Sequence, residues 1–70
     1  MQNQMTITLY GSSVARAHAK HMLENHASVK RIDDSQNNRI LMLLTKGIGE
    51  NEIIALLSQS GISGMKIACR

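Results

Sequence analysis

The stretch Val29–Thr45, with the sequence VKRIDDSQNNRILMLLT, decides how this chain folds. At its centre, Asp34–Asn38 is a dense run of residues that favour turns. The residues before the turn, Val29–Asp34, form a short predicted strand, and those after it, Arg39–Thr45, are the most apolar stretch of the chain. Two strands joined by such a turn indicate a β-hairpin. Because the second strand is apolar on both faces, we expect it to lie in the centre of a sheet.

A strand and a helix are predicted before the hairpin. Residues Met5–Tyr10 alternate with a period of two, which is typical of a half-buried strand. Gly11 ends this strand, Ser12–Ser13 provides a helix N-cap, and a helix is predicted over Val14–Asn25. The alternation puts three apolar side chains of the strand on one face: Met5, Ile7 and Leu9. The buried stripe of the helix recurs at steps of three and four residues: Ala15, Ala19, Met22, Leu23 and His26.

A second helix and a last strand follow the hairpin. Lys46–Gly49 is a predicted loop, and Glu50–Ser60 is a predicted helix with acidic residues in its first turn and Gly61 as its stop. Residues Gly64–Cys69 alternate again, as expected of a strand. The buried stripe of the second helix is expected to contain Ile53, Ile54, Leu56 and Leu57. One face of the last strand is expected to carry Met65, Ile67 and Cys69.

The predicted order of elements is βαββαβ. Right-handed crossovers then place both helices on one face of a four-stranded antiparallel sheet, with the first and third strands in the middle. This arrangement is the ferredoxin-like α+β sandwich, which leaves the other face of the sheet bare. A chain of 70 residues has room for one core. We therefore expect a single domain over residues 5–70, preceded by a polar, disordered start at residues 1–4.

Composition excludes several classes of protein. No apolar run approaches the ~20 residues that span a bilayer, and the first residues lack the order of a secretory signal. The single cysteine cannot form an internal disulfide, which favours a reducing, cytoplasmic setting. The net charge is +3, but the basic residues are scattered and Tyr10 is the one aromatic ring. This distribution argues against nucleic-acid binding, which uses aromatic faces and clustered cations.

The sequence also gives no sign of an enzyme. Asp33 and Asp34 are neighbours on a predicted strand, so their carboxylates point to opposite faces and do not form an acid–base pair. The chain contains no Ser-His-Asp order, no glycine-rich phosphate loop and no HExxH motif. We expect a non-enzymatic protein.

The spacing of several segments resembles the heavy-metal-associated (HMA) domain of copper chaperones and metal-pumping ATPases. In that family a first strand leads into a loop, M-x-C-x-x-C, at the start of helix one. An ungapped comparison puts Tyr10 at the methionine of this loop, Ser12 at the first cysteine and Ala15 at the second. The segment Glu52–Ile62 is similar to the second helix of the family and its A-G-Y ending. The resemblance covers residues 5–69 and implies the same ferredoxin-like fold.

The two cysteines that hold a soft metal ion in that family are missing here. A serine hydroxyl is not deprotonated near neutral pH and alanine offers no ligand, so we expect no metal at Ser12 and Ala15. Chaperones of the family dock on partners through basic residues around helix one, and Arg16 and Lys20 lie on the predicted polar face of that helix. The resemblance therefore implies a domain that has lost its metal site, needs no cofactor and acts by protein–protein interaction.

A metal-binding protein or metallochaperone with displaced ligands is the alternative. His18 and His21 lie three residues apart on the predicted helix and can share one copper or zinc ion, although the same spacing suits two surface histidines. His26 falls on the buried stripe, where we expect a partly buried, hydrogen-bonded imidazole. Cys69 is expected to be a small core residue.

The bare face of the sheet is a further candidate for a binding surface. An apolar patch on a small domain marks a contact surface, so we expect a protein partner or self-association through this face. Its predicted residues are Thr6, Thr8 and Tyr10 of the first strand, Leu41 and Leu43 of the third, and Lys66 and Ala68 near the edge. The predicted interaction residues are Tyr10, Ser12, Arg16, Lys20, Leu41 and Leu43.

Overall fold

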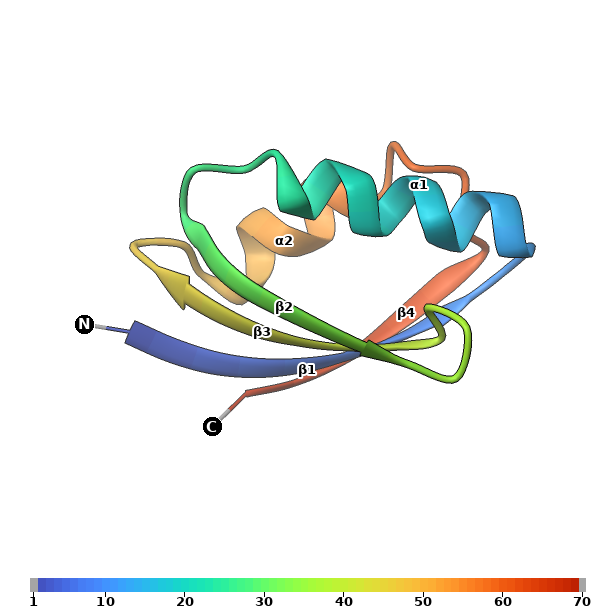
Figure 1. Ribbon diagram of the computed structural model, residues 1–70. Coiled ribbons are helices and arrows are strands. Elements are labelled where there is room, and N and C mark those ends of the chain that lie inside the picture. Colours follow the sequence, from blue (N-terminus) through green and yellow to red (C-terminus); the bar gives the residue numbers. More distant parts are fainter. Residues whose placement is uncertain (1, 70) are drawn as a thin grey trace.

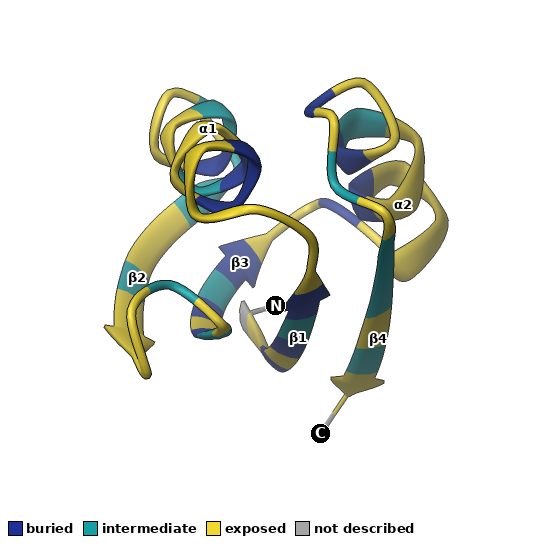
Figure 2. Ribbon diagram, turned by 90° about the vertical axis from the view of Figure 1, so that its right-hand side faces the viewer, coloured by how far each residue is buried: buried dark blue, intermediate teal, exposed yellow. Residues whose placement is uncertain are grey.

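The chain folds in the predicted order, βαββαβ (Figure 1). A computed structural model describes residues 2–69. Its elements are β1 (Gln2–Tyr10), α1 (Ser13–Glu24), β2 (Val29–Ser35), β3 (Ile40–Lys46), α2 (Glu50–Leu57) and β4 (Gly64–Cys69). The strands form one antiparallel sheet in the order β2-β3-β1-β4, and both helices lie on the same face of it (Figure 2). The ferredoxin-like α+β fold, with β1 and β3 in the centre, is confirmed.

Strand β1 begins earlier than its hydrophobic pattern suggests. Residues 2–4, which the sequence predicts to be disordered, continue the strand and pair with residues 44–46 of β3. The Thr45 side chain is buried beside them, and its hydroxyl donates a hydrogen bond to the Asn3 carbonyl oxygen at 3.4 Å. Backbone pairing with β3 therefore orders this polar segment. The sequence pattern did not predict it, because the segment has no alternation of apolar residues. Met1 lies outside the described residues.

The core lies between the two helices and the sheet. Ala15 and Ala19 are buried in α1, and their small side chains let the helix approach the sheet closely. Met65 and Ile67 of β4 pack against the edge of the core, as their alternation predicts. The buried apolar cluster consists of Met5, Ile7, Leu9, Ala19, Leu23, Leu41, Leu43, Ile48, Ile53 and Leu57.

Leu41 and Leu43 belong to this core, so the prediction that they face away from the helices is wrong. Their exposed fractions are 0% and 2%. Leu41 pairs with Ile7 and Leu43 pairs with Met5 in the register of the sheet, and directly paired residues point to the same face. Strand β3 is apolar at odd and even positions alike, so its own periodicity does not reveal which set faces the helices.

Helix α1 begins at the predicted cap, whereas α2 differs from the prediction in its C-terminal end and in its buried stripe. The Ser12 hydroxyl caps α1 by accepting a hydrogen bond from the Ala15 amide at 3.1 Å. Helix α2 ends at Leu57, earlier than predicted, and the Ser60 hydroxyl donates to the Leu57 carbonyl oxygen at 2.6 Å in the turn that follows. Ile54, predicted in the buried stripe, is 40% exposed. Neither helix within residues 2–69 is long and apolar enough to cross a membrane.

The turn between β2 and β3 has a left-handed backbone at three successive residues. Gln36, Asn37 and Asn38 have φ angles of 52°, 57° and 64°. L-residues pay conformational energy in this region, and asparagine tolerates it better than glutamine does. The Arg39 amide donates a hydrogen bond to the Gln36 carbonyl oxygen at 3.2 Å and closes the turn. The turn sets how β3 is placed against β2.

Candidate functional site

The face of the sheet opposite the helices carries no second layer of the described chain (Figure 1). Side chains alternate along a strand, so the even-numbered residues between positions 4 and 10 of β1 and between positions 40 and 44 of β3 point to this face, as do the residues paired with them. We call this surface the open face. It consists of Gln4, Thr6, Thr8, Tyr10, Arg31, Asp33, Ser35, Ile40, Met42, Leu44, Lys66 and Ala68.

An apolar row runs along β3 in the middle of the open face. Met42 is 46% exposed, and Ile40 and Leu44 on either side of it are half-buried. Tyr10, at the end of β1, is 49% exposed. The other side of β3 already fills the core, so this row is not needed to hold the helices. Exposed apolar side chains that gather on one face are typical of a contact surface.

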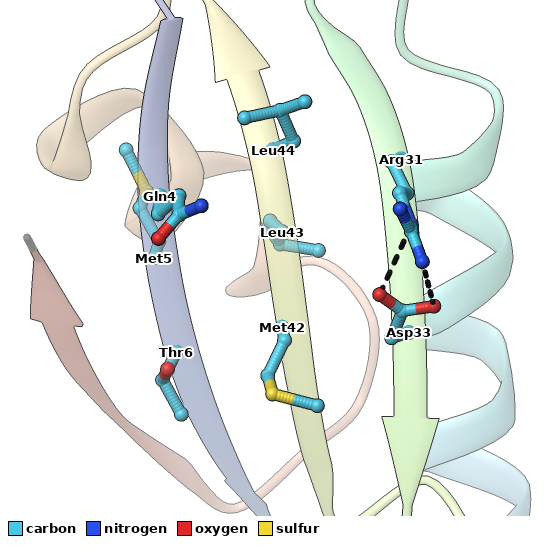
Figure 3. Close-up of a pocket in the computed structure, with 8 residues that line it drawn as sticks. All are labelled: Gln4, Met5, Thr6, Arg31, Asp33, Met42, Leu43 and Leu44. Carbon is cyan, nitrogen blue, oxygen red and sulfur yellow. Dashed lines mark hydrogen bonds and ion pairs between the residues drawn. The ribbon is translucent and has the colours of Figure 1, made fainter.

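A hollow of about 350 Å³ lies in the open face over β1, β3 and β2 (Figure 3). Its middle is apolar, and an ion pair stands on the β2 side, where the Arg31 Nε lies 3.1 Å from the Asp33 Oδ2. The lining residues are Gln4, Met5, Thr6, Arg31, Asp33, Met42, Leu43 and Leu44.

The basic residues predicted for docking at helix α1 are engaged within the domain. The sequence places Arg16 on the polar face, but its exposed fraction is 7%, and its Nη1 donates a hydrogen bond to the Gly11 carbonyl oxygen at 3.0 Å. Lys20 pairs with Asp34 of β2, with 2.5 Å between Nζ and Oδ2. Ser12 caps the helix. These contacts attach α1 to its neighbours and leave little of the predicted basic surface for a partner.

The contact between Lys20 and Asp34 shifts the pKa of both groups. The hydrogen bond from Lys20 holds the pKa of the Asp34 carboxyl below its ordinary value. The same hydrogen bond, opposed in part by desolvation, raises the pKa of Lys20. Both groups are therefore charged at neutral pH, and the pair acts as a link between α1 and the end of β2.

The three histidines hydrogen-bond to different neighbours. His18 Nδ1 lies 3.1 Å from the Ser60 carbonyl oxygen, and His21 Nε2 lies 3.1 Å from Asn25 Nδ2. His26 is half-buried, and its Nδ1 accepts a hydrogen bond from the amide two residues along the chain at 3.1 Å, which confirms the predicted environment. Within residues 2–69, no three His, Cys, Asp or Glu side chains gather into a metal-binding group. An ion shared by His18 and His21 would need ligands from elsewhere.

Cys69 lies on the surface, so the prediction of a core residue is wrong. It is the last residue of the edge strand β4, and its Sγ lies 3.8 Å from the Glu50 Oε2 of α2. Desolvation, and then the nearby Glu50 carboxylate, raise the pKa of the thiol. A raised pKa lowers the fraction of nucleophilic thiolate at neutral pH, so the position does not suit an activated cysteine.

Sequence reasoning missed part of the open face. The residues that it did not assign are Gln4, Arg31, Asp33, Ser35, Ile40, Met42 and Leu44. A signal for the two charged residues was present, because opposite charges two positions apart on a strand share a face. The apolar residues of β3 could be assigned only from the register with β1, in which Thr6 pairs with Met42.

No protein-family model matches the sequence, and no curated protein matches it either. Among solved structures, the fold is similar to that of a transcriptional regulatory protein of the AsnC family from Pyrococcus furiosus, with a TM-score of 0.55 and 9% sequence identity. The match covers 97% of this chain and 49% of the other chain, so this chain spans about half the length of that protein. At such an identity the likeness shows the ferredoxin-like fold alone.

Proposed function

We propose that this chain is a non-enzymatic interaction domain that binds a protein partner through the open face. The observation that carries the proposal is the apolar row of β3, in which Met42 is 46% exposed between Ile40 and Leu44. A small domain buries a modest share of its surface on folding, so covering this row by association yields further stability.

The residues of the open face indicate what kind of surface a partner would present. The row on β3 suits an apolar stripe of another protein, and the thioether of Met42 adapts to the shape of what it meets. The polar margins differ from each other: Arg31 and Asp33 form an ion pair on the β2 side, while Lys66 stands on the β4 side. A complementary surface would place apolar groups in its centre and polar groups at its rim.

We further propose that the fold is an HMA-type scaffold whose metal loop has taken on a structural role. The Ser12 hydroxyl, at the position of the first cysteine, is used to cap α1. Ala15, at the position of the second cysteine, is buried under the same helix end. Both positions therefore support the domain in ways that a thiolate pair held open for a metal ion would not.

Affinity capture with the purified domain tests the use of the open face. We expect Met42→Asp to abolish capture of partner proteins, because it places a carboxylate in the middle of the apolar row. The matched control is Val14→Asp, an equivalent change at a residue of α1 that is 77% exposed. Circular dichroism would verify that both variants are folded. Equal capture by the wild type and by Met42→Asp would contradict the proposal.

Native mass spectrometry with added Cu(I) or Zn(II) tests the loss of the metal site. We expect no stoichiometric uptake at neutral pH. Binding of one equivalent with sub-micromolar affinity would overturn this part of the proposal. The alternative, a metal-binding protein that uses His18 and His21, predicts that such uptake disappears in the His18→Ala/His21→Ala variant.

A further inference from the structure

Strand β2 is an edge strand with a self-complementary pattern of charges. Its sequence, VKRIDDS, puts Lys30 and Arg31 before Ile32 and puts Asp33 and Asp34 after it. In the sheet order, β3 is the one described strand that pairs with β2. The backbone amides and carbonyls on the other side of β2 therefore form an edge that can accept a further strand.

We infer that β2 pairs with β2 of a second copy of this chain, antiparallel and centred on Ile32. In this register Arg31 lies opposite Asp33 of the second copy, within the part of β2 where the ladder is regular. Ile32 meets its own symmetry mate. The two-fold axis makes this contact occur twice, so Arg31 and Asp33 of each copy face an opposite charge.

The neighbouring registers are disfavoured by the same residues. Side chains alternate along a strand, so only shifts of two residues keep the helices of both copies on one side of the joined sheet. One such shift sets Arg31 opposite Arg31, and the other sets Asp33 opposite Asp33. Directly opposed like charges destabilise strand pairing. The sequence of β2 therefore selects one register and rejects its neighbours.

The geometry of β2 leaves room for these contacts. The side chains of Arg31 and Asp33 are 70% and 50% exposed, so each can accept a second ionic partner while keeping the first. The ladder with β3 is regular from Arg31 to Ser35, and its irregularity falls between Val29 and Arg31. Beside the strand lies a hollow of about 200 Å³ that a side chain of a second copy can enter. Its lining residues are Glu24, Val29, Lys30, Arg31 and Ile32.

The opposite edge of the sheet lacks this pattern. Lys66 is the one charged residue of β4. Symmetric pairing of β4 would set Lys66 against its own copy or against an uncharged residue. The proposed contact is therefore specific to β2. It would join two four-stranded sheets into one of eight strands and bring two open faces together on one side, and it does not depend on what the open face binds.

Charge reversal tests the proposed dimer. Sedimentation velocity over a concentration series at low salt should show a monomer–dimer equilibrium that weakens as salt is added. We expect Arg31→Glu alone and Asp33→Arg alone to raise the dissociation constant by about ten-fold or more, because each sets like charges opposite one another. An equimolar mixture of these two variants should restore the dimer, since each charge of one variant then meets an opposite charge of the other.

Two controls separate this contact from others. Lys66→Glu, on the opposite edge, and Met42→Ser, an uncharged change on the open face, should leave the dissociation constant of the dimer unchanged. A dimer that is lost in Met42→Ser and kept in Arg31→Glu would place the contact on the open face and overturn the inference. A wild-type chain that stays monomeric at low salt over the whole concentration series would overturn it as well.

Crosslinking tests the register. In a Cys69→Ser background, Ile32→Cys places two thiols across the two-fold axis, at a separation that a disulfide can bridge. Oxidation should therefore join Ile32→Cys chains faster than Ser35→Cys chains, whose thiols lie far apart in this register. Equal rates for the two variants would contradict pairing centred on Ile32.

Discussion

The two faces of the sheet are built from the same strands, but β1 and β3 distribute their apolar side chains differently between these faces. Strand β1 sends Met5, Ile7 and Leu9 to the helices and places threonines on the open face. Strand β3 sends apolar side chains to both faces, with Leu41 buried and Met42 46% exposed next to it in the chain. The core therefore accounts for the apolar residues of β1 apart from Tyr10 at its end, but for only some of the apolar residues of β3.

This difference separates residues that are buried when the domain folds from residues that stay exposed to solvent. A buried leucine of β3 contacts the helices and contributes to the free energy of unfolding. An exposed apolar residue of the same strand contributes little to that free energy, because its surface stays in contact with water. Folding alone therefore does not account for its apolar side chain, and the contact proposed above would account for it.

Alanine substitution at adjacent positions of β3 gives the largest expected contrast. Leu41→Ala should lower the free energy of unfolding by about 2–5 kcal/mol, because it removes a fully buried side chain and leaves a cavity. Met42→Ala should change it by less than about 0.5 kcal/mol, as is usual for an exposed position. Urea unfolding monitored by circular dichroism measures both values. Equal losses at the two positions would show that the open face is covered in the folded protein.

The sequence predicts the fold well because its strongest signals are local. The alternation in β1, the cap at Ser12 and the turn formers between β2 and β3 each act within a few residues, and the order of elements follows from them. These signals were sufficient for the sheet order and the position of both helices.

The site was less predictable because its residues depend on long-range pairing. Which residues of β3 face outward is set by its register with β1, and either choice buries an apolar set. The engagement of Arg16 with the Gly11 carbonyl oxygen and of Lys20 with Asp34 likewise joins segments whose approach the helix pattern does not encode. A helical projection shows which residues lie on the polar face of a helix. Tertiary contacts, which the projection does not contain, determine which of these residues remain free to contact a partner.

The turn before β3 helps to fix which residues of that strand face the helices. Gln36 has a φ of 52° and no glycine occupies the turn. Gln36→Gly should stabilise the domain by up to about 1 kcal/mol, since glycine adopts a positive φ without the steric cost that a Cβ imposes. Gln36→Ala, which keeps the Cβ, is the matched control and should give no such gain. A thermal melt that ranks the alanine variant above the glycine variant would contradict this account of the turn.

The smallest expected effect concerns the ion pair between Lys20 of α1 and Asp34 of β2. This pair should make the stability of the domain depend on pH. The pKa of Asp34 is lowered in the folded state, so its contribution to stability is present above the unfolded pKa, about 4, and is lost as the pH falls through the lower, folded pKa. The pKa of Lys20 is raised, so its contribution is present below about pH 10 and is lost as the pH rises through the folded pKa.

Asp34→Asn should therefore melt below the wild type by a small, constant interval between about pH 5 and 9, and the interval should narrow outside that range. Lys20→Met should reproduce this profile. In the Lys20→Met background, Asp34→Asn should have little further effect, because the partner of the carboxylate is already gone. If the two substitutions lower the melting temperature additively at neutral pH, then Asp34 acts on stability without Lys20, and the attachment of α1 to this side of the sheet rests on its buried alanines and leucine alone.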